Sequence, residues 1–228
     1  MKDDFSAIAR ICQELSENER SNGVKYFEVS INPHHLLTLD KSPEKIRELL
    51  ELVSSNFEET EATNGVKFGI ILQYERGMFE EGKHLLSLCS DLKESNVVGL
   101  ELGGLDTKSV ENNPEDFFDQ EDLNIFEEAK ESQVHRSIIV ENSCSPEVVF
   151  QAIEKLHAER IVFGYSVSQD DSLYMDCITN KITFITTPIL SLCLGLPGDL
   201  SVVFHKFLGA NSVGDTNTIQ ERSTSRSN

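Results

Sequence analysis

The chain has 228 residues, of which 39% are hydrophobic, 7% aromatic and 26% charged, a composition typical of a globular domain rather than a disordered chain. It carries 39 acidic and 20 basic side chains, which gives a formal net charge of −19. A surface of this sign repels nucleic-acid phosphates and anionic membranes, so neither is expected as a partner, while a small neutral ligand or a basic protein surface stays open.

The cysteines and the N-terminal residues predict a cytoplasmic protein. The five cysteines are scattered, odd in number and form no CxxC pair, which indicates reduced thiols. No basic segment followed by an apolar core opens the chain, so no signal peptide is expected. The most apolar stretch, residues 190–196, is too short to span a bilayer.

Apolar, β-rich runs alternate along the chain with segments of helical periodicity. Near-continuous apolar runs are typical of strands covered on both faces, and the repeated strand–helix order predicts a parallel α/β protein. Ser42 before Pro43 and Ser145 before Pro146 are expected to begin two of the helices. The six expected strands are residues 26–31, 66–72, 97–102, 137–140, 160–164 and 182–185, with a weaker seventh run near 211–216.

Two segments interrupt this alternation. Residues 105–120 are acidic and contain Asn112-Asn113-Pro114, which predicts a long solvated loop. Residues 220–228 are polar and rich in Ser, Thr and Arg, which predicts a disordered tail. A single domain over residues 1–219 is therefore expected.

Several segments carry short motifs that occur in the same order in one protein family: residues 22–29, 32–37, 98–104, 135–149, 158–165 and, less closely, 187–191. Through these motifs the chain resembles the adenosine deaminase family of metal-dependent aminohydrolases. Residues 135–149 and 158–165 are similar to its HAGE and RIGHG segments and the helix between them. The resemblance implies a TIM-type (β/α)8 barrel with its site at the carboxyl ends of the strands. The barrel is expected to be incomplete, with the first strand and the C-terminal helices missing.

The resemblance also implies one Zn²⁺ ion that activates water for attack on a purine, with an acid and a base nearby. This sequence departs from the family at the matching positions. Ile139 stands where the family has a zinc-binding histidine, Asn142 where it has the proton donor, and Phe163 where it has the histidine that orients water. Thr216 and Asn217 stand where it has an aspartate pair, of which the first is a zinc ligand.

Some nearby residues keep an alternative open. Asp215 lies next to the matched pair and is a candidate for a relocated zinc ligand, and His34 and His35 could join it. The family's opening His-x-His pair has no counterpart in this sequence. Gly104 matches a glycine whose backbone approaches the purine, although a tight turn would also explain it.

Tyr26, Arg76 and Arg160 also match family positions and are interpreted as structural. Three functional hypotheses follow. The first is a non-catalytic family member without a metal cofactor, which binds a purine-like small molecule or a protein. The second is an active zinc-dependent purine aminohydrolase whose site is relocated, or completed by a second copy or a related chain. The third is a truncated product without a function of its own.

Overall fold

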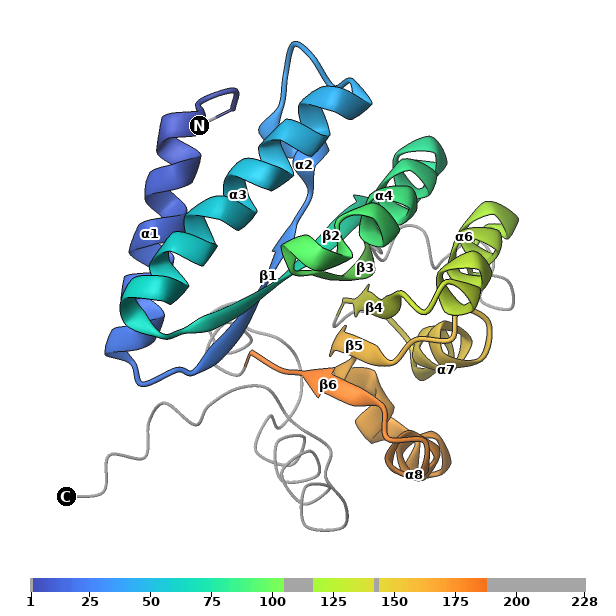
Figure 1. Ribbon diagram of the computed structural model, residues 1–228. Coiled ribbons are helices and arrows are strands. Elements are labelled where there is room, and N and C mark those ends of the chain that lie inside the picture. Colours follow the sequence, from blue (N-terminus) through green and yellow to red (C-terminus); the bar gives the residue numbers. More distant parts are fainter. Residues whose placement is uncertain (1, 105–116, 142–143, 188–228) are drawn as a thin grey trace, which may run out of the picture.

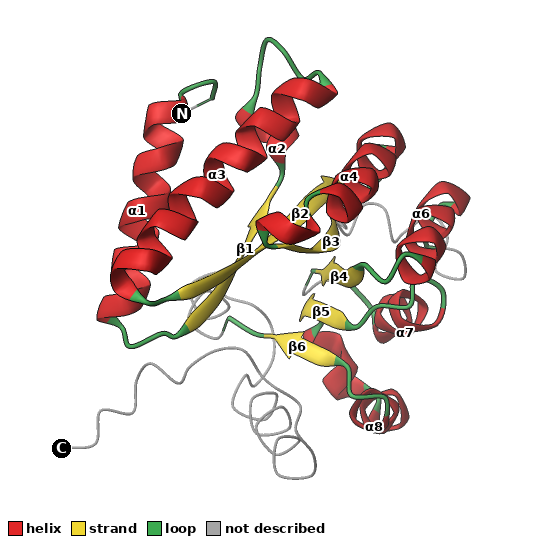
Figure 2. Cartoon of the chain, in the orientation of Figure 1, coloured by secondary structure: helices red, strands yellow, loops and turns green. Residues whose placement is uncertain are grey.

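The computed structural model describes residues 2–104, 117–141 and 144–187. In this part of the chain, parallel strands form one curved sheet in the order β1-β2-β3-β4-β5-β6, and the helices cover its outer face (Figure 1, Figure 2). The described residues therefore form an incomplete (β/α) barrel. The strands are β1 (Tyr26–Ile31), β2 (Lys67–Glu75), β3 (Val97–Gly103), β4 (His135–Val140), β5 (Arg160–Phe163) and β6 (Thr183–Ile185).

The helices alternate with these strands, as the sequence predicts. They are α1 (Phe5–Ser21), α2 (Pro33–Leu36), α3 (Pro43–Asn64), α4 (Phe79–Asp91), α6 (Gln120–Glu131), α7 (Pro146–Glu154) and α8 (Asp171–Thr179), with 3-10 turns η1 (Lys93–Ser95) and η2 (Tyr165–Gln169). None of the helices in the described ranges is long and apolar enough to cross a membrane.

Local sequence explains where α3 and α7 begin. Ser42 caps α3 by accepting a hydrogen bond from the Lys45 backbone N–H at 3.3 Å, and Pro43 supplies the first helical residue. Ser145 and Pro146 occupy the same positions at α7, but there the serine side chain makes no capping hydrogen bond. Both predicted starts are confirmed.

The main core lies between the sheet and the helices. Every second side chain of β2 points to the helical layer and is completely buried, namely Ile70, Leu72 and Tyr74. The helices contribute fully buried side chains such as Ile46 and Leu49 of α3. Each such side chain contributes about 1.5–3 kcal/mol through burial, so this layer dominates the stability of the fold.

The opposite, inner face of the sheet carries a group of hydrogen-bonded polar side chains. Glu101 of β3 and Ser137 of β4 are paired in the sheet register, and the serine hydroxyl donates to the glutamate at 2.7 Å. Ser30 of β1 donates to the other oxygen of Glu101 at 2.5 Å. The expectation that strands are covered on both faces fails at β1, where Ser30 is exposed, because β1 lies at one edge of the described sheet.

An ion pair across the inner face reports how strongly the sheet curves. A guanidinium nitrogen of Arg160 on β5 lies 2.5 Å from Glu28 Oε2 on β1, although β2, β3 and β4 separate the two strands. Four interstrand spacings would place these residues roughly 19 Å apart in a flat sheet. The sheet must therefore curl toward its inner face, as it does in a barrel.

The expected loop over residues 105–120 is only partly described, and its last residues correct the prediction. Phe117 and Phe118 are buried, and α6 begins at Gln120. The aromatic pair enters the core, which outweighs the acidic character of the segment. Residues 105–116, the seventh run and the polar tail lie outside the described residues.

A buried carboxyl group links β2 to the first turn of α6. The Tyr74 hydroxyl donates to Asp122 Oδ1 at 2.9 Å, and Asp122 has no exposed surface. Its second oxygen has no hydrogen-bond partner among the described residues. Burial raises the pKa of Asp122 to about 6.

Because the folded-state pKa exceeds the ordinary value of 3.8, this group stabilises the fold fully at low pH, and that stability is lost as pH rises through about 6. We expect Asp122→Asn, which mimics the protonated group, to raise the free energy of unfolding by roughly 2 kcal/mol at pH 8 and to change it little near pH 4. Urea unfolding at both pH values measures this difference. Asp176→Asn, at an exposed position of α8, is the control and should change neither value; a wild-type chain more stable than Asp122→Asn at pH 8 would contradict the prediction.

Candidate functional site

The carboxyl ends of the parallel strands meet along one rim of the sheet, where (β/α) barrels carry their sites. Residues that end or follow a strand there include Asn32 after β1, Arg76 after β2 and Gly104 after β3. Phe163 ends β5. We call this edge the rim.

Ile139 lies on the inner face at the rim. It is two residues beyond Ser137 on β4, so its side chain points to the same side of the sheet as that serine. A Cβ atom placed on the neighbouring Gly103 would lie 3.5 Å from Ile139 Cδ1 and only 2.6 Å from Gln73 Nε2. An apolar side chain and an amide thus occupy the inner rim at β2, β3 and β4.

Phe163 ends β5 in the left-handed backbone region, with φ of 66°, and Gly164 follows with φ of 59°. This conformation is rare for a bulky residue and costs about 1–2 kcal/mol. The sheet holds it in place, because Phe163 pairs with Val140 of β4 and the Gly164 N–H donates to the Val140 carbonyl at 3.0 Å. Backbone strain of this kind concentrates at functional sites.

Gly104 occupies a tight turn directly after β3. Its φ is 72°, and an added Cβ atom would meet Glu75 Cβ at 3.3 Å. The preceding carbonyl of Gly103 accepts the Arg76 N–H at 3.0 Å, which joins this turn to the end of β2. The turn requires glycine for conformational reasons, and contact with a ligand remains a prediction.

His34 and His35 are placed together by α2, but their rings bind different carboxylates. His34 Nδ1 lies 3.5 Å from Glu81 of α4, whereas His35 Nε2 lies 3.3 Å from Glu75 of β2. Burial lowers the pKa of His34, and Glu81 opposes that shift. Within residues 2–104, 117–141 and 144–187, no group of three or more His, Cys, Asp or Glu side chains is arranged to hold a metal ion.

The remaining predicted site residues are not placed by the structure. Asn142, Asp215, Thr216 and Asn217 all lie outside the described residues. The relocated zinc site that Asp215 would form with the two histidines therefore stays a prediction.

The structure adds a polar network on the inner face that the motif analysis missed. Glu28 accepts a hydrogen bond from the Tyr26 hydroxyl at 2.7 Å and pairs with Arg160, so both expected structural residues converge on one carboxylate. Glu101 joins Ser30 and Ser137 one level higher. Polar residues at every second position of the apolar strands could have indicated this network, but the sequence does not show which residues pair with one another.

Arg76 also has a structural environment. Its guanidinium lies 4.4 Å from the centre of the Phe117 ring and donates to the Phe117 carbonyl. It also lies 3.4 Å from a carboxylate oxygen of Asp119. It therefore ties the end of β2 to the residues that lead into α6.

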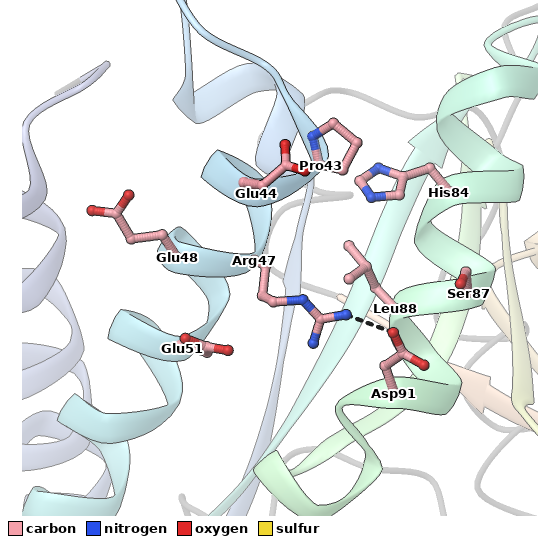
Figure 3. Close-up of a pocket in the computed structure, with 9 residues that line it drawn as sticks. All are labelled: Pro43, Glu44, Arg47, Glu48, Glu51, His84, Ser87, Leu88 and Asp91. Carbon is pink, nitrogen blue, oxygen red and sulfur yellow. Dashed lines mark hydrogen bonds and ion pairs between the residues drawn. The ribbon is translucent and has the colours of Figure 1, made fainter.

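A separate groove lies on the outer surface between α3 and α4, with a volume of about 410 Å³ (Figure 3). Arg47 reaches across it and pairs with Asp91 at 2.5 Å. Glu44, Glu48 and His84 also line it. The groove lies between the helices rather than at the rim, and the motifs of the sequence do not involve it.

Removing the buried acceptor Glu101 tests the inner network. Glu101→Ala leaves the Ser30 and Ser137 hydroxyls without their acceptor, so we expect the free energy of unfolding to fall by about 1–3 kcal/mol. Chemical denaturation followed by circular dichroism measures the change. Glu94→Ala, at an exposed position in η1, should cost less than about 0.5 kcal/mol; equal losses in the two variants would show that the network adds no stability.

The chain is similar in sequence to curated adenosine deaminases. It is 31% identical over 201 residues to the adenosine deaminase of Danio rerio, and the aligned region covers 84% of this chain and 54% of that protein. It is 30% identical over 194 residues to that of Xenopus laevis, with 81% and 52% covered. The chain thus spans about half the length of these relatives.

Solved structures agree at the level of the fold. The adenine deaminase of Arthrobacter aurescens superposes with a TM-score of 0.71 at 16% identity, covering 92% of this chain and 60% of that one. A Zn-bound cog1816 amidohydrolase from Burkhoderia ambifaria gives a TM-score of 0.68, also at 16% identity, covering 89% and 55%. The family model for adenosine deaminase matches residues 2–196. The chain therefore belongs to the adenosine deaminase family.

Proposed function

We propose that this chain is a non-catalytic member of the adenosine deaminase family that binds a purine-like small molecule at the rim. The observation that carries the proposal is Ile139, an aliphatic side chain on the inner face at the position matched to a zinc-binding histidine. Phe163, in its strained backbone conformation, supports it at the position matched to the histidine that orients water.

The described rim residues do not fit a zinc ion. Zinc in proteins takes nitrogen, sulfur or carboxylate ligands, commonly three or four in a tetrahedral arrangement. Ile139 and Phe163 offer none, and no group of three or more His, Cys, Asp or Glu side chains in the described ranges is arranged to hold a metal ion. Asn142, at the position of the proton donor, carries an amide that cannot supply a proton as a carboxylic acid does.

Binding without chemistry is compatible with what remains at the rim. Ile139 offers apolar surface to a flat ring on the inner face, and the resemblance matches Gly104, directly after β3, to a glycine whose backbone approaches the purine. The names of the relatives, adenosine deaminase and adenine deaminase, favour a purine as that ring.

Metal analysis and an activity assay on the same purified chain test the absence of catalysis. We expect less than stoichiometric zinc and no conversion of adenosine or its monophosphate, even with zinc added. A chain that retains one zinc per molecule and deaminates either compound would refute the proposal.

Purine binding is tested at Gly104. Gly104→Ala adds a methyl group and backbone strain at the turn after β3, so we expect at least about tenfold weaker binding of adenosine in equilibrium dialysis. Gly23→Ala is the matched control, since Gly23 has a similar φ of 80° but open space around it at the turn before β1. Equal adenosine affinity in both variants would remove Gly104 from the binding site, and no binding to the wild-type chain would end the purine proposal.

The competing function is an active aminohydrolase that uses His34, His35 and Asp215. The positions of the two histidines on α2, directly after β1, favour it over other relocated sites. It predicts that replacing both histidines by alanine abolishes deamination. Turnover that survives this replacement would exclude the arrangement.

A further inference from the structure

A hollow of about 330 Å³ lies on the inner face where the strands begin, at the end opposite to the rim. Arg160 starts β5 and Thr183 starts β6, and the two residues are paired in the sheet register. Lys181 precedes β6, and Glu28 faces the hollow from β1. The volume is within the range of small-molecule sites.

The basic side chains of this hollow differ in how many of their N–H groups already bind other protein groups. Arg136 is occupied, because it donates to the carbonyls of His157 and Val134 at 2.8 Å each and to Glu159 at 2.6 Å. Arg160 pairs with Glu28 through one nitrogen, which leaves other N–H groups of its guanidinium available.

Lys181 differs from the two arginines because its ammonium group binds no described residue. Its ammonium group has no hydrogen bond or ion pair to any residue in the described ranges. Its backbone is fixed by a left-handed turn, with φ of 58°, in which its N–H donates to the Ile178 carbonyl at 3.1 Å. The base of this side chain is therefore held beside the hollow.

The hollow has a net positive charge, whereas the whole chain has a net negative charge. Arg136, Arg160 and Lys181 face the two carboxylates of Glu28 and Glu159, which leaves one net positive charge in a protein of net charge −19. We propose that this hollow binds a phosphate group, held by Lys181, the free N–H groups of Arg160 and the Thr183 hydroxyl. The proposal is independent of purine binding at the rim.

The arrangement favours phosphate over a carboxylate. Lysine offers a point charge and arginine a planar fork, and together with a hydroxyl they can serve three oxygen atoms of a tetrahedral group. Ser137 adds no donor, because its hydroxyl already serves Glu101. Since Glu28 and Glu159 weaken the attraction, we expect a dissociation constant of about 1 mM rather than tight binding.

Isothermal titration of the full chain with inorganic phosphate at constant ionic strength tests the site. We expect saturable binding by the wild-type chain and at least about tenfold weaker binding by Lys181→Glu. Lys181→Gly removes the charge but suits the left-handed turn, so it should weaken binding severalfold without unfolding the chain. The matched control is Lys41→Glu, an equal charge change at an exposed position between α2 and α3, which should leave the affinity within about twofold.

Competition distinguishes the sources of the phosphate. Displacement of inorganic phosphate by adenosine monophosphate, but not by adenosine, shows that the hollow accepts a phosphate monoester, and failure of both to displace it shows a site for the free ion. The proposal is overturned if the wild-type chain shows no saturable binding up to about 10 mM phosphate, if Lys41→Glu weakens binding as much as Lys181→Glu, or if adenosine alone displaces the phosphate.

Discussion

The curvature of the sheet determines which side chains meet on its inner face, and the ion pair between Glu28 and Arg160 shows how strong that curvature is. It joins β1 to β5 across three intervening strands at 2.5 Å, which only a strongly curled sheet permits. The bond from Ser30 to Glu101 spans β2 in the same way. Curvature separates an outer face that packs against helices from an inner face on which polar side chains meet.

This division of faces gives the two ends of the inner face different chemistry. At the rim, Ile139 presents an apolar side chain where the family resemblance places a zinc-binding histidine. At the other end, Arg160 and Lys181 present positive charge around a hollow. The middle is held by Glu101, whose two serine partners satisfy a carboxylate that would otherwise be costly to bury.

The rim combines family features that have different physical requirements. The turn at Gly104 and the strained end of β5 are backbone features of this chain, and neither requires a metal-binding side chain. Coordination of a metal depends on side-chain donors, and a single change such as histidine to isoleucine removes it. A scaffold can therefore keep its shape after its chemistry is lost, which is the physical basis of the proposed binding function.

The positions of the helices and strands could be predicted from the sequence, because they depend on local periodicity and capping. The apolar runs located all the described strands to within a few residues, Ser42 and Pro43 located the start of α3, and the ordered motifs located the family. The apolar character of positions 139 and 163 is likewise a property of the sequence alone.

Contacts between side chains that are distant in the sequence could not be predicted and become visible in the folded chain. The partners of Glu28, Glu101 and Asp122 come from strands or helices far along the chain, and they depend on sheet curvature and helix packing, which no local pattern specifies. The separate carboxylate partners of His34 and His35 are of the same kind. Sequence periodicity fixes the face on which a residue lies, but the distance across that face is set by how the whole sheet closes.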